Sequence, residues 1–209
     1  MVANTFSPFG FRSFGRLEGG APTAGLTRLY LLSSDTNLYF TGDPVAISSA
    51  SLTAGYITLP ASGTLTQVSG IFAGCEYYSP SVGRVVWSDY FPGNVGSSSP
   101  CNAYVITDPD QLFTVQCTTT AVVGTSAIGL NVGWASSLQA TGNTLSGISN
   151  VALNSSTISA NSSLPFRIVD TTSNFAPPGV NGADGTTAGA IMVVAPNNWA
   201  RRTLTAYST

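Results

Sequence analysis

Short apolar or alternating runs dominate the pattern of hydrophobic positions along this chain. They are rich in β-branched and aromatic residues and lie between clusters of Gly, Pro, Asp and Ser, a pattern typical of strands. The predicted strands are Thr27 to Leu32, Asn37 to Phe40, Val45 to Ile47, Tyr56 to Leu59, Leu65 to Val68, Ile71 to Tyr78, Arg84 to Tyr90, Ala103 to Ile106, Leu112 to Cys117, Phe166 to Val169 and Ile191 to Val194. No long segment has the periodicity of an amphipathic helix.

These runs predict an all-β fold, a single-domain β-barrel or jelly-roll-like β-sandwich of about ten short strands. Turn-forming strings such as Gly42-Asp43-Pro44 and Asp108-Pro109-Asp110 separate them. We expect the β domain to span residues 26–209.

The first 25 residues do not fit this pattern and predict an extended N-terminal arm over residues 1–25. Their aromatic and basic side chains have a spacing typical of neither a helix nor a regular strand. The candidate interface residues of this arm are Phe6, Phe9, Phe11, Arg12, Phe14 and Arg16. Such apolar rings either pack against the chain's own barrel or anchor the arm on a neighbouring subunit, since aromatic residues and Arg are favoured in interface cores.

A second departure is the stretch rich in Ser, Thr and Asn at residues 135–164. It is either a long excursion or a set of weakly specified strands, because structureless loops of such length are uncommon in compact domains.

Composition narrows the classes of function. Only 8% of residues are charged, against about a quarter in an average soluble domain, while 43% are hydrophobic and the mean hydropathy is +0.23. This combination is the reverse of a disordered chain. The net charge is −2 and the pI about 4.7, with no basic run, so no nucleic-acid partner is expected.

The segment from Gln111 to Phe166 contains no charged residue. Polar residues and glycines interrupt it too often for a spanning helix, and no membrane association is expected. The N-terminus lacks the charged and apolar regions of a secretory signal, which favours synthesis in a cytoplasm. We expect part of this uncharged segment to form a docking surface rather than core.

Catalytic chemistry finds little support. The chain has no histidine and no lysine, which removes imidazole bases and Schiff-base chemistry, and no phosphate-binding glycine motif is present. Asp108 with Asp110, or Glu76 with Asp89, would be the only carboxylate pairs to consider, and the former is better explained as a turn. We therefore expect no enzyme and no cofactor.

Three cysteines, Cys75, Cys101 and Cys117, are expected to be thiols, because they cannot all pair and a zinc site would need further ligands. A different possibility is a sugar-stacking platform built from Trp87, Tyr90, Trp134 and Trp199. Such residues in a sheet protein are more often core or interface.

Several strings occur in a characteristic order along the chain. They are Phe9-Gly10-Phe11-Arg12, Leu17-Glu18-Gly19-Gly20-Ala21-Pro22, Tyr39-Phe40-Thr41-Gly42-Asp43-Pro44-Val45, Gly70-Ile71-Phe72-Ala73-Gly74-Cys75-Glu76-Tyr77, Asp108-Pro109-Asp110 with Phe113-Thr114-Val115-Gln116, and Pro165-Phe166-Arg167-Ile168-Val169. In this order they resemble the capsid decoration proteins of tailed bacteriophages, also called cement or head-stabilisation proteins. The resemblance spans most of residues 8–170 and does not extend to the tail with Arg201-Arg202.

This resemblance implies a structural virion protein on the outer surface of an icosahedral phage head, made in the host cytoplasm. Its partners would be the major capsid protein and itself, with a homotrimer favoured and a dimer second. A surface of uncharged polar groups suits such docking, because hydroxyls and amides cost less to desolvate than unpaired charges. The alternative function is a carbohydrate- or receptor-binding β module of a virion, such as a head fibre or tail component.

Overall fold

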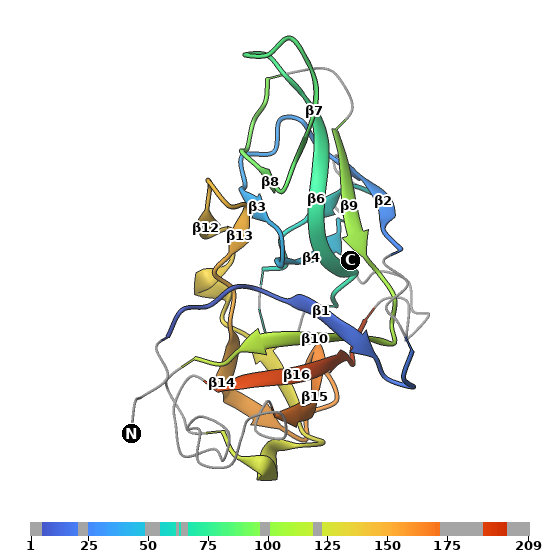
Figure 1. Cartoon of the computed structure of the whole chain (residues 1–209), viewed down its shortest axis with the longest axis vertical. Helices are drawn as coiled ribbons and strands as arrows, with labels where there is room; N and C mark the ends of the chain where they lie inside the picture. The colour runs from blue at the N-terminus through green and yellow to red at the C-terminus, as the bar shows by residue number, and fades with distance from the viewer. Residues whose placement is uncertain are drawn as a thin grey trace.

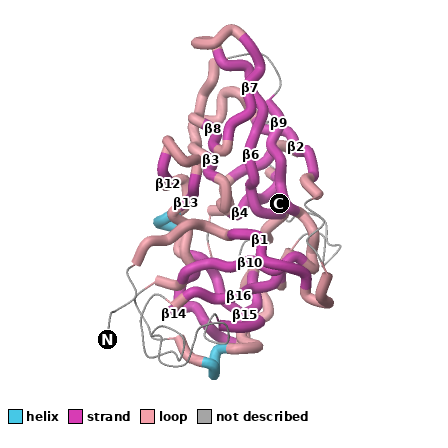
Figure 2. Tube along the Cα trace, in the orientation of Figure 1, coloured by secondary structure: helices cyan, strands magenta, loops and turns pink. Residues whose placement is uncertain are grey.

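The computed structural model describes residues 6–20, 25–48, 55–61, 63, 67–96, 101–118, 123–171 and 190–199. Within these residues the chain forms sixteen strands and two short 3-10 helices, with no α-helix (Figures 1 and 2). The prediction of an all-β fold is confirmed. The number of strands exceeds the expected one partly because five of them, β3, β5, β8, β12 and β13, have only two residues.

Six strands form what we call the lower sheet, after its place in Figure 1, in the order β1-β10-β16-β15-β11-β14. Their bounds are β1 Arg12–Arg16, β10 Gln111–Gln116, β11 Asn131–Trp134, β14 Leu153–Ser159, β15 Phe166–Thr171 and β16 Ile191–Pro196. All neighbours pair antiparallel.

The upper sheet follows the order β2-β9-β6-β4-β5, and β7 pairs with the second half of β6, on the edge opposite β9. Its strands are β2 Thr27–Leu31, β4 Pro44–Ile47, β5 Ile57–Thr58, β6 Gly70–Ser79, β7 Arg84–Ser88 and β9 Cys101–Ile106. The remaining elements are the pair β3 Tyr39–Phe40 with β8 Tyr90–Phe91, the pair β12 Gly142–Asn143 with β13 Ile148–Ser149, and the 3-10 helices η1 Thr125–Ala127 and η2 Ser136–Leu138.

Each sheet has its own hydrophobic core. The lower core is dominated by aromatic rings from strands distant in sequence: Phe11, Phe113, Trp134, Phe166 and Trp199. The upper core consists mainly of Leu31, Tyr39, Val45, Phe72, Cys75, Phe91, Ala103 and Val105. Strict alternation along β9, where every second residue is buried, shows how a period of two directs one face of the sheet inward.

The path of the chain differs between the two sheets. Every strand of the upper sheet lies between β1 and β10 in sequence, whereas the lower sheet combines β1 with strands that follow residue 110. In sequence, the segment that forms the upper sheet is thus inserted between β1 and the rest of the lower sheet. The chain leaves the lower sheet after β1 and returns to it after β9 (Figure 1).

Most predicted strands are found in the structure, with shifts of a few residues at their ends. Residues 65 and 66 of the predicted strand Leu65 to Val68, and the Arg201-Arg202 tail, lie outside the described residues. Val68 itself forms only an isolated bridge to Trp199.

One expectation about a particular segment was wrong. Residues 12–16 form a strand, β1, with one bulge, although no strand was predicted there. The uncharged segment 111–166 is partly core, since Phe113, Val132 and Phe166 are fully buried. Other parts of it, such as residues 160–163, are exposed, and a docking surface formed by them stays a prediction. In residues 135–164 the structure contains η2, β12, β13 and β14, which corresponds to the alternative of weakly specified strands.

Candidate functional site

The predicted interface residues belong to β1 and the segment before it, and the structure gives them different environments. Phe11 is 2% exposed and belongs to the lower core. Its ring stacks on Phe166 with centroids 4.4 Å apart and meets Phe113 edge-on at 6.1 Å. Phe11 therefore packs against the chain itself, which is one of the two alternatives considered for these rings.

The other three phenylalanines are more accessible. Phe6 is 38% and Phe14 47% exposed, and Phe9 is half-buried. Phe14 lies where the pairing of β1 with β10 is interrupted by a bulge between Ser13 and Gly15. A bulge inserts one extra residue and re-aims its side chain, so an exposed ring at this position is expected.

The two arginines of β1 have separate roles. Arg12 is half-buried, and its Nε donates to the carbonyl of Phe9 at 3.2 Å. Burial lowers the pKa of Arg12, whereas the nearby Asp89 carboxylate raises it. Since guanidinium remains protonated in proteins, Arg12 is a fixed positive charge near the meeting point of the sheets.

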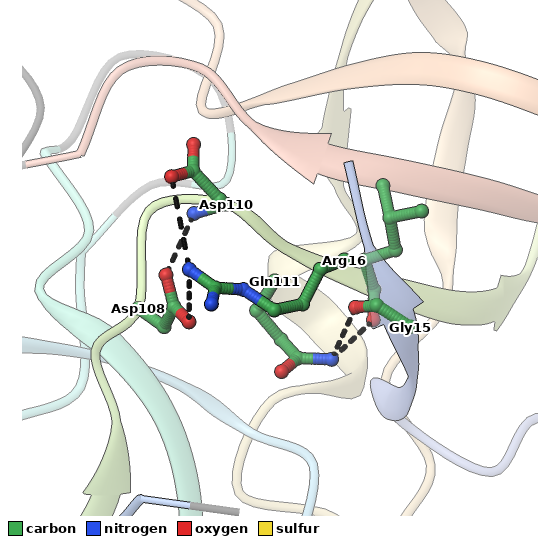
Figure 3. Close-up of polar contacts among 6 residues, drawn as sticks. Gly15, Arg16, Asp108, Asp110 and Gln111 are labelled. Atoms are coloured by element: carbon green, nitrogen blue, oxygen red, sulfur yellow. Dashed lines mark hydrogen bonds and ion pairs between the residues drawn. The ribbon is translucent and has the colours of Figure 1, made fainter. Parts of the chain in front are cut away.

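Arg16 connects the two passages of the chain between the sheets (Figure 3). Its Nη2 lies 3.3 Å from Asp108 Oδ2 and 4.0 Å from Asp110 Oδ2. The Asp108 carboxylate also accepts the backbone N–H of Asp110 at 3.0 Å, which is the turn role predicted for this string.

Further contacts join these two connecting segments, and we call this region between the sheets the neck. Gln111, which is 2% exposed, donates its Nε2 to the carbonyls of Gly15 at 2.8 Å and Leu112 at 2.9 Å (Figure 3). The N–H of Leu17 donates to the carbonyl of Asp110 at 2.9 Å. The acidic pair is therefore structural: it holds the N-terminal strand to the turn that re-enters the lower sheet.

The sheets meet again at a close approach of two glycines. Gly10 and Gly42 both have positive φ, and a Cβ on Gly42 would lie 2.9 Å from the Phe11 nitrogen. The Phe11 N–H donates to the Gly42 carbonyl at 3.1 Å. Only glycine combines this backbone conformation with such close contact.

Asp43 is the buried charge at this junction. It is fully buried, and its carboxylate accepts the Ser149 hydroxyl at 2.6 Å and the Phe40 N–H at 2.9 Å. Burial raises the pKa of Asp43 to about 7, although the two hydrogen bonds oppose this shift. The strings Phe9-Gly10-Phe11-Arg12, Gly42-Asp43-Pro44 and Pro165-Phe166-Arg167-Ile168 are thus brought together in space.

Beside β1, the outer side of the lower sheet contains an apolar hollow of about 460 Å³. Its lining consists of Leu17, Ile128, Gly129, Arg167, Ile168, Val169, Ala195 and Asn197. Leu17 is 43% and Ile128 40% exposed, and Arg167 supplies one exposed positive charge at the rim. Exposed aliphatic groups gathered around a depression are typical of protein contact sites.

No catalytic or metal centre is evident in the part of the chain that the structure describes. It contains no group of three His, Cys, Asp or Glu residues placed to hold a metal ion. Cys75, Cys101 and Cys117 are buried thiols, and burial raises the pKa of each. Buried thiols of this kind behave as small hydrophobic residues.

The four aromatic residues predicted as a sugar-stacking platform lie in different environments. Trp134 and Trp199 are 1% and 0% exposed and belong to the lower core, so the reading of these two as core residues is confirmed. Tyr90 is half-buried and stacks on Phe40 with centroids 5.6 Å apart. Trp87, by contrast, is 51% exposed on β7.

Comparison of the chain with protein-family models, curated proteins and solved structures finds no match. Among the described residues there is no helix with the length and apolar character needed to cross a bilayer.

Sequence reasoning identified β1 as a candidate site but missed the hollow next to it. Leu17 lies just after β1, Ile128 follows η1, and Val169 and Ala195 come from β15 and β16. Because the hollow forms only when these elements pair in the lower sheet, no short motif could have indicated it. The exposed Leu17, adjacent to the predicted Arg16, was the nearest available signal.

Proposed function

We propose that this chain is a structural virion protein that binds the outer surface of an icosahedral phage head. It stabilises the head by bridging neighbouring major capsid protein subunits, and a homotrimer is the favoured assembly, with a dimer second. The family resemblance in residues 8–170 motivates this proposal. The observation that carries it is the apolar hollow beside β1.

The hollow has the properties that docking to a protein shell requires. Its exposed aliphatic side chains, Leu17 and Ile128, would favour binding, because their removal from water by a partner lowers the free energy of the complex. A specific contact needs about 1,000 Å² of buried surface, so the contact would extend beyond the hollow, for example over the exposed Phe14 of β1. An oligomer that touches several capsid subunits would then bind by avidity.

A rigid mode of binding also favours a structural role. Four of the eight residues that line the hollow lie on the paired strands β15 and β16, and the neck contacts of Arg16 and Gln111 fix β1 against β10. Pre-organised surfaces lose little conformational entropy on binding.

The test is binding of the purified protein to expanded phage heads that lack it. We expect saturable binding at a regular stoichiometry and greater resistance of the heads to heat. The double variant Leu17→Asp with Ile128→Asp should bind at least about tenfold more weakly, because two charges would be buried at the contact. The control Leu145→Asp, at a residue 98% exposed on the β12–β13 turn, should bind normally.

Point variants are preferable to removal of the N-terminal segment. A truncation before Leu17 would remove Phe11 from the lower core as well as the exposed residues. If the wild-type protein shows no saturable binding to heads, capsid binding is wrong. If the hollow variant and the wild type bind equally, the contact surface lies elsewhere.

A further inference from the structure

A transverse row of four side chains crosses the outer face of the upper sheet. In register, Tyr30 of β2 faces Asn102 of β9, Asn102 faces Glu76 of β6, and Glu76 faces Trp87 of β7. Directly paired residues in neighbouring strands lie on the same face of a sheet. The row therefore places an aromatic ring at each end and an amide and a carboxylate between them.

This face is turned away from the upper core. The residues that alternate with the row, such as Leu31, Cys75 and Ala103, are the ones buried in that core. The two rings of the row are consequently open to solvent: Tyr30 is 56% and Trp87 51% exposed. The row thus has a large, half-exposed aromatic ring at each end, with polar groups between the two rings.

A glycine holds Trp87 in a defined position. Gly74 has a φ of +141°, and a Cβ there would lie 2.6 Å from Cζ2 of the Trp87 indole. The indole therefore lies against the backbone of β6, a contact that is possible because Gly74 has no side chain. Its Nε1 is also 3.4 Å from the Asp89 carboxylate, and the ring touches Tyr104 with centroids 4.9 Å apart. Trp87 is thus a pre-oriented platform.

Charged groups of both signs surround this platform. The Tyr104 hydroxyl donates to the Glu76 carboxylate, which raises the pKa of Tyr104. Arg28 lies opposite Tyr104 in the register of β2 with β9, and its charge acts on Tyr104 in the opposite sense. With Asp89 beside the indole, two carboxylates and one guanidinium lie around the platform, and this small excess of negative charge favours a neutral ligand over a polyanion.

We propose that this face of the upper sheet binds a neutral oligosaccharide. The C–H faces of the sugar rings stack on Trp87 and Tyr30, and the hydroxyls bond to Glu76 and Asn102 between them. The weakly positive C–H groups of a pyranose complement the negative face of an aromatic ring. Four neighbouring strands at about 4.8 Å spacing make the row roughly 14 Å long, which suits a short oligosaccharide rather than a single sugar. This site is separate from the apolar hollow and does not depend on capsid binding.

Tryptophan fluorescence gives a direct test, because Trp87 is the exposed one among the three tryptophans of the chain. Iodide should quench part of the emission of the free protein, and that part should be protected by a neutral hexasaccharide. The probes are cellohexaose, maltohexaose, chitohexaose and mannohexaose at up to millimolar concentration. We expect at least one of them to protect Trp87 saturably, and a sulfated dextran fragment to protect it less.

Variants assign the effect to the row. Tyr30→Ala, read by fluorescence, and Trp87→Ala, read by calorimetry, should each weaken binding of the protecting sugar at least about tenfold. Leu145→Ala is the control and should bind as the wild type does. Both ring variants remove exposed side chains, so their circular dichroism should be unchanged.

Three results would overturn the proposal. The first is that none of the four sugars protects Trp87 at any concentration tested. The second is that iodide fails to quench the free protein, since the face would then be covered. The third is unchanged affinity in Trp87→Ala. Normal head binding by Trp87→Ala is expected in every case and keeps this test separate from that of capsid binding.

Discussion

The two sheets of this protein have the same antiparallel architecture but present opposite chemistry to solvent. The outer face of the upper sheet carries aromatic rings with charged groups of both signs, whereas the lower sheet carries an aliphatic hollow beside its edge strand. Their cores differ as well, because the upper core comes from one continuous segment and the lower core joins both sides of that insertion. The two binding sites that we propose thus lie on different sheets of a chain with only 8% charged residues.

The largest expected effect separates the lower core from its surface. Phe11→Ala should lower the free energy of unfolding by about 3 to 5 kcal/mol, because it leaves a cavity between Phe113 and Phe166. Phe14→Ala, at a ring 47% exposed, should cost less than about 1 kcal/mol. Chemical denaturation measures both values, and hydrogen exchange in Phe11→Ala should rise more in β10 and β16 than in β6 and β9. Equal losses in the two variants would contradict the assignment of Phe11 to the core.

The junction between the sheets should respond to pH. The pKa of Asp43 is about 7 in the folded protein, above its ordinary value of 3.8, so the folded state holds the proton more tightly. The protonated carboxyl therefore contributes its full stabilisation below about pH 4. As the pH rises to about 7 this contribution is lost, and the free energy of unfolding should fall by about 2 to 4 kcal/mol. Asp43→Asn keeps the shape and should flatten this dependence in thermal unfolding between pH 4 and 8. A wild-type protein that becomes more stable over this range would count against the buried carboxyl.

A glycine pair tests the position of Trp87 on the upper sheet. Gly74→Ala should cost about 1 to 3 kcal/mol and shift the emission of Trp87, since the new methyl group strains the backbone and displaces the indole. Gly83→Ala is the matched control, because Gly83 also has positive φ but has open space around it. Its loss should be smaller and its emission unchanged. The same emission shift in both variants would contradict the contact.

The neck between the sheets should show the smallest effect. Arg16→Gln removes a partly exposed ion pair with Asp108 and should cost less than about 1 kcal/mol. The loss should shrink further in high salt, because solvent-exposed charges are screened. Denaturation in low and high salt measures it, with Arg84→Gln on the exposed start of β7 as the control. A loss that does not depend on salt would mean that Arg16 acts through packing.

Fold class and most strands could be predicted from the sequence, because β9 and β10 bury alternate or continuous apolar runs between clear turn residues. β1 could not, since Gly15 and a bulge interrupt its alternation and its pairing with β10 is set by tertiary contacts. The same is true of β14, which is rich in Ser and is specified by its partner β11 rather than by its own side chains.

The candidate sites show the limit of sequence patterns more sharply. The aromatic residues were recognised as a set, but only pairing with neighbours decides which of them is core. Trp134 and Trp199 point into the lower core, whereas Trp87 lies over Gly74 on an outer face. Similarly, a lack of charge is compatible with a buried core and with an uncharged interface. The uncharged segment 111–166 has both buried and exposed parts, and burial depends on tertiary contacts that are not local in sequence.

The insertion of one sheet into another has a consequence for the order of folding during synthesis. The upper sheet is complete once residue 106 has been made, whereas β1 must wait for β10, and the lower core closes only with Trp199. At roughly 5 to 20 residues per second, Phe11 stays without its core partners for on the order of ten seconds or more. Nascent chains should therefore carry an unpaired β1 ahead of a folded upper sheet, and during that interval chaperones and neighbouring copies of the chain have access to β1.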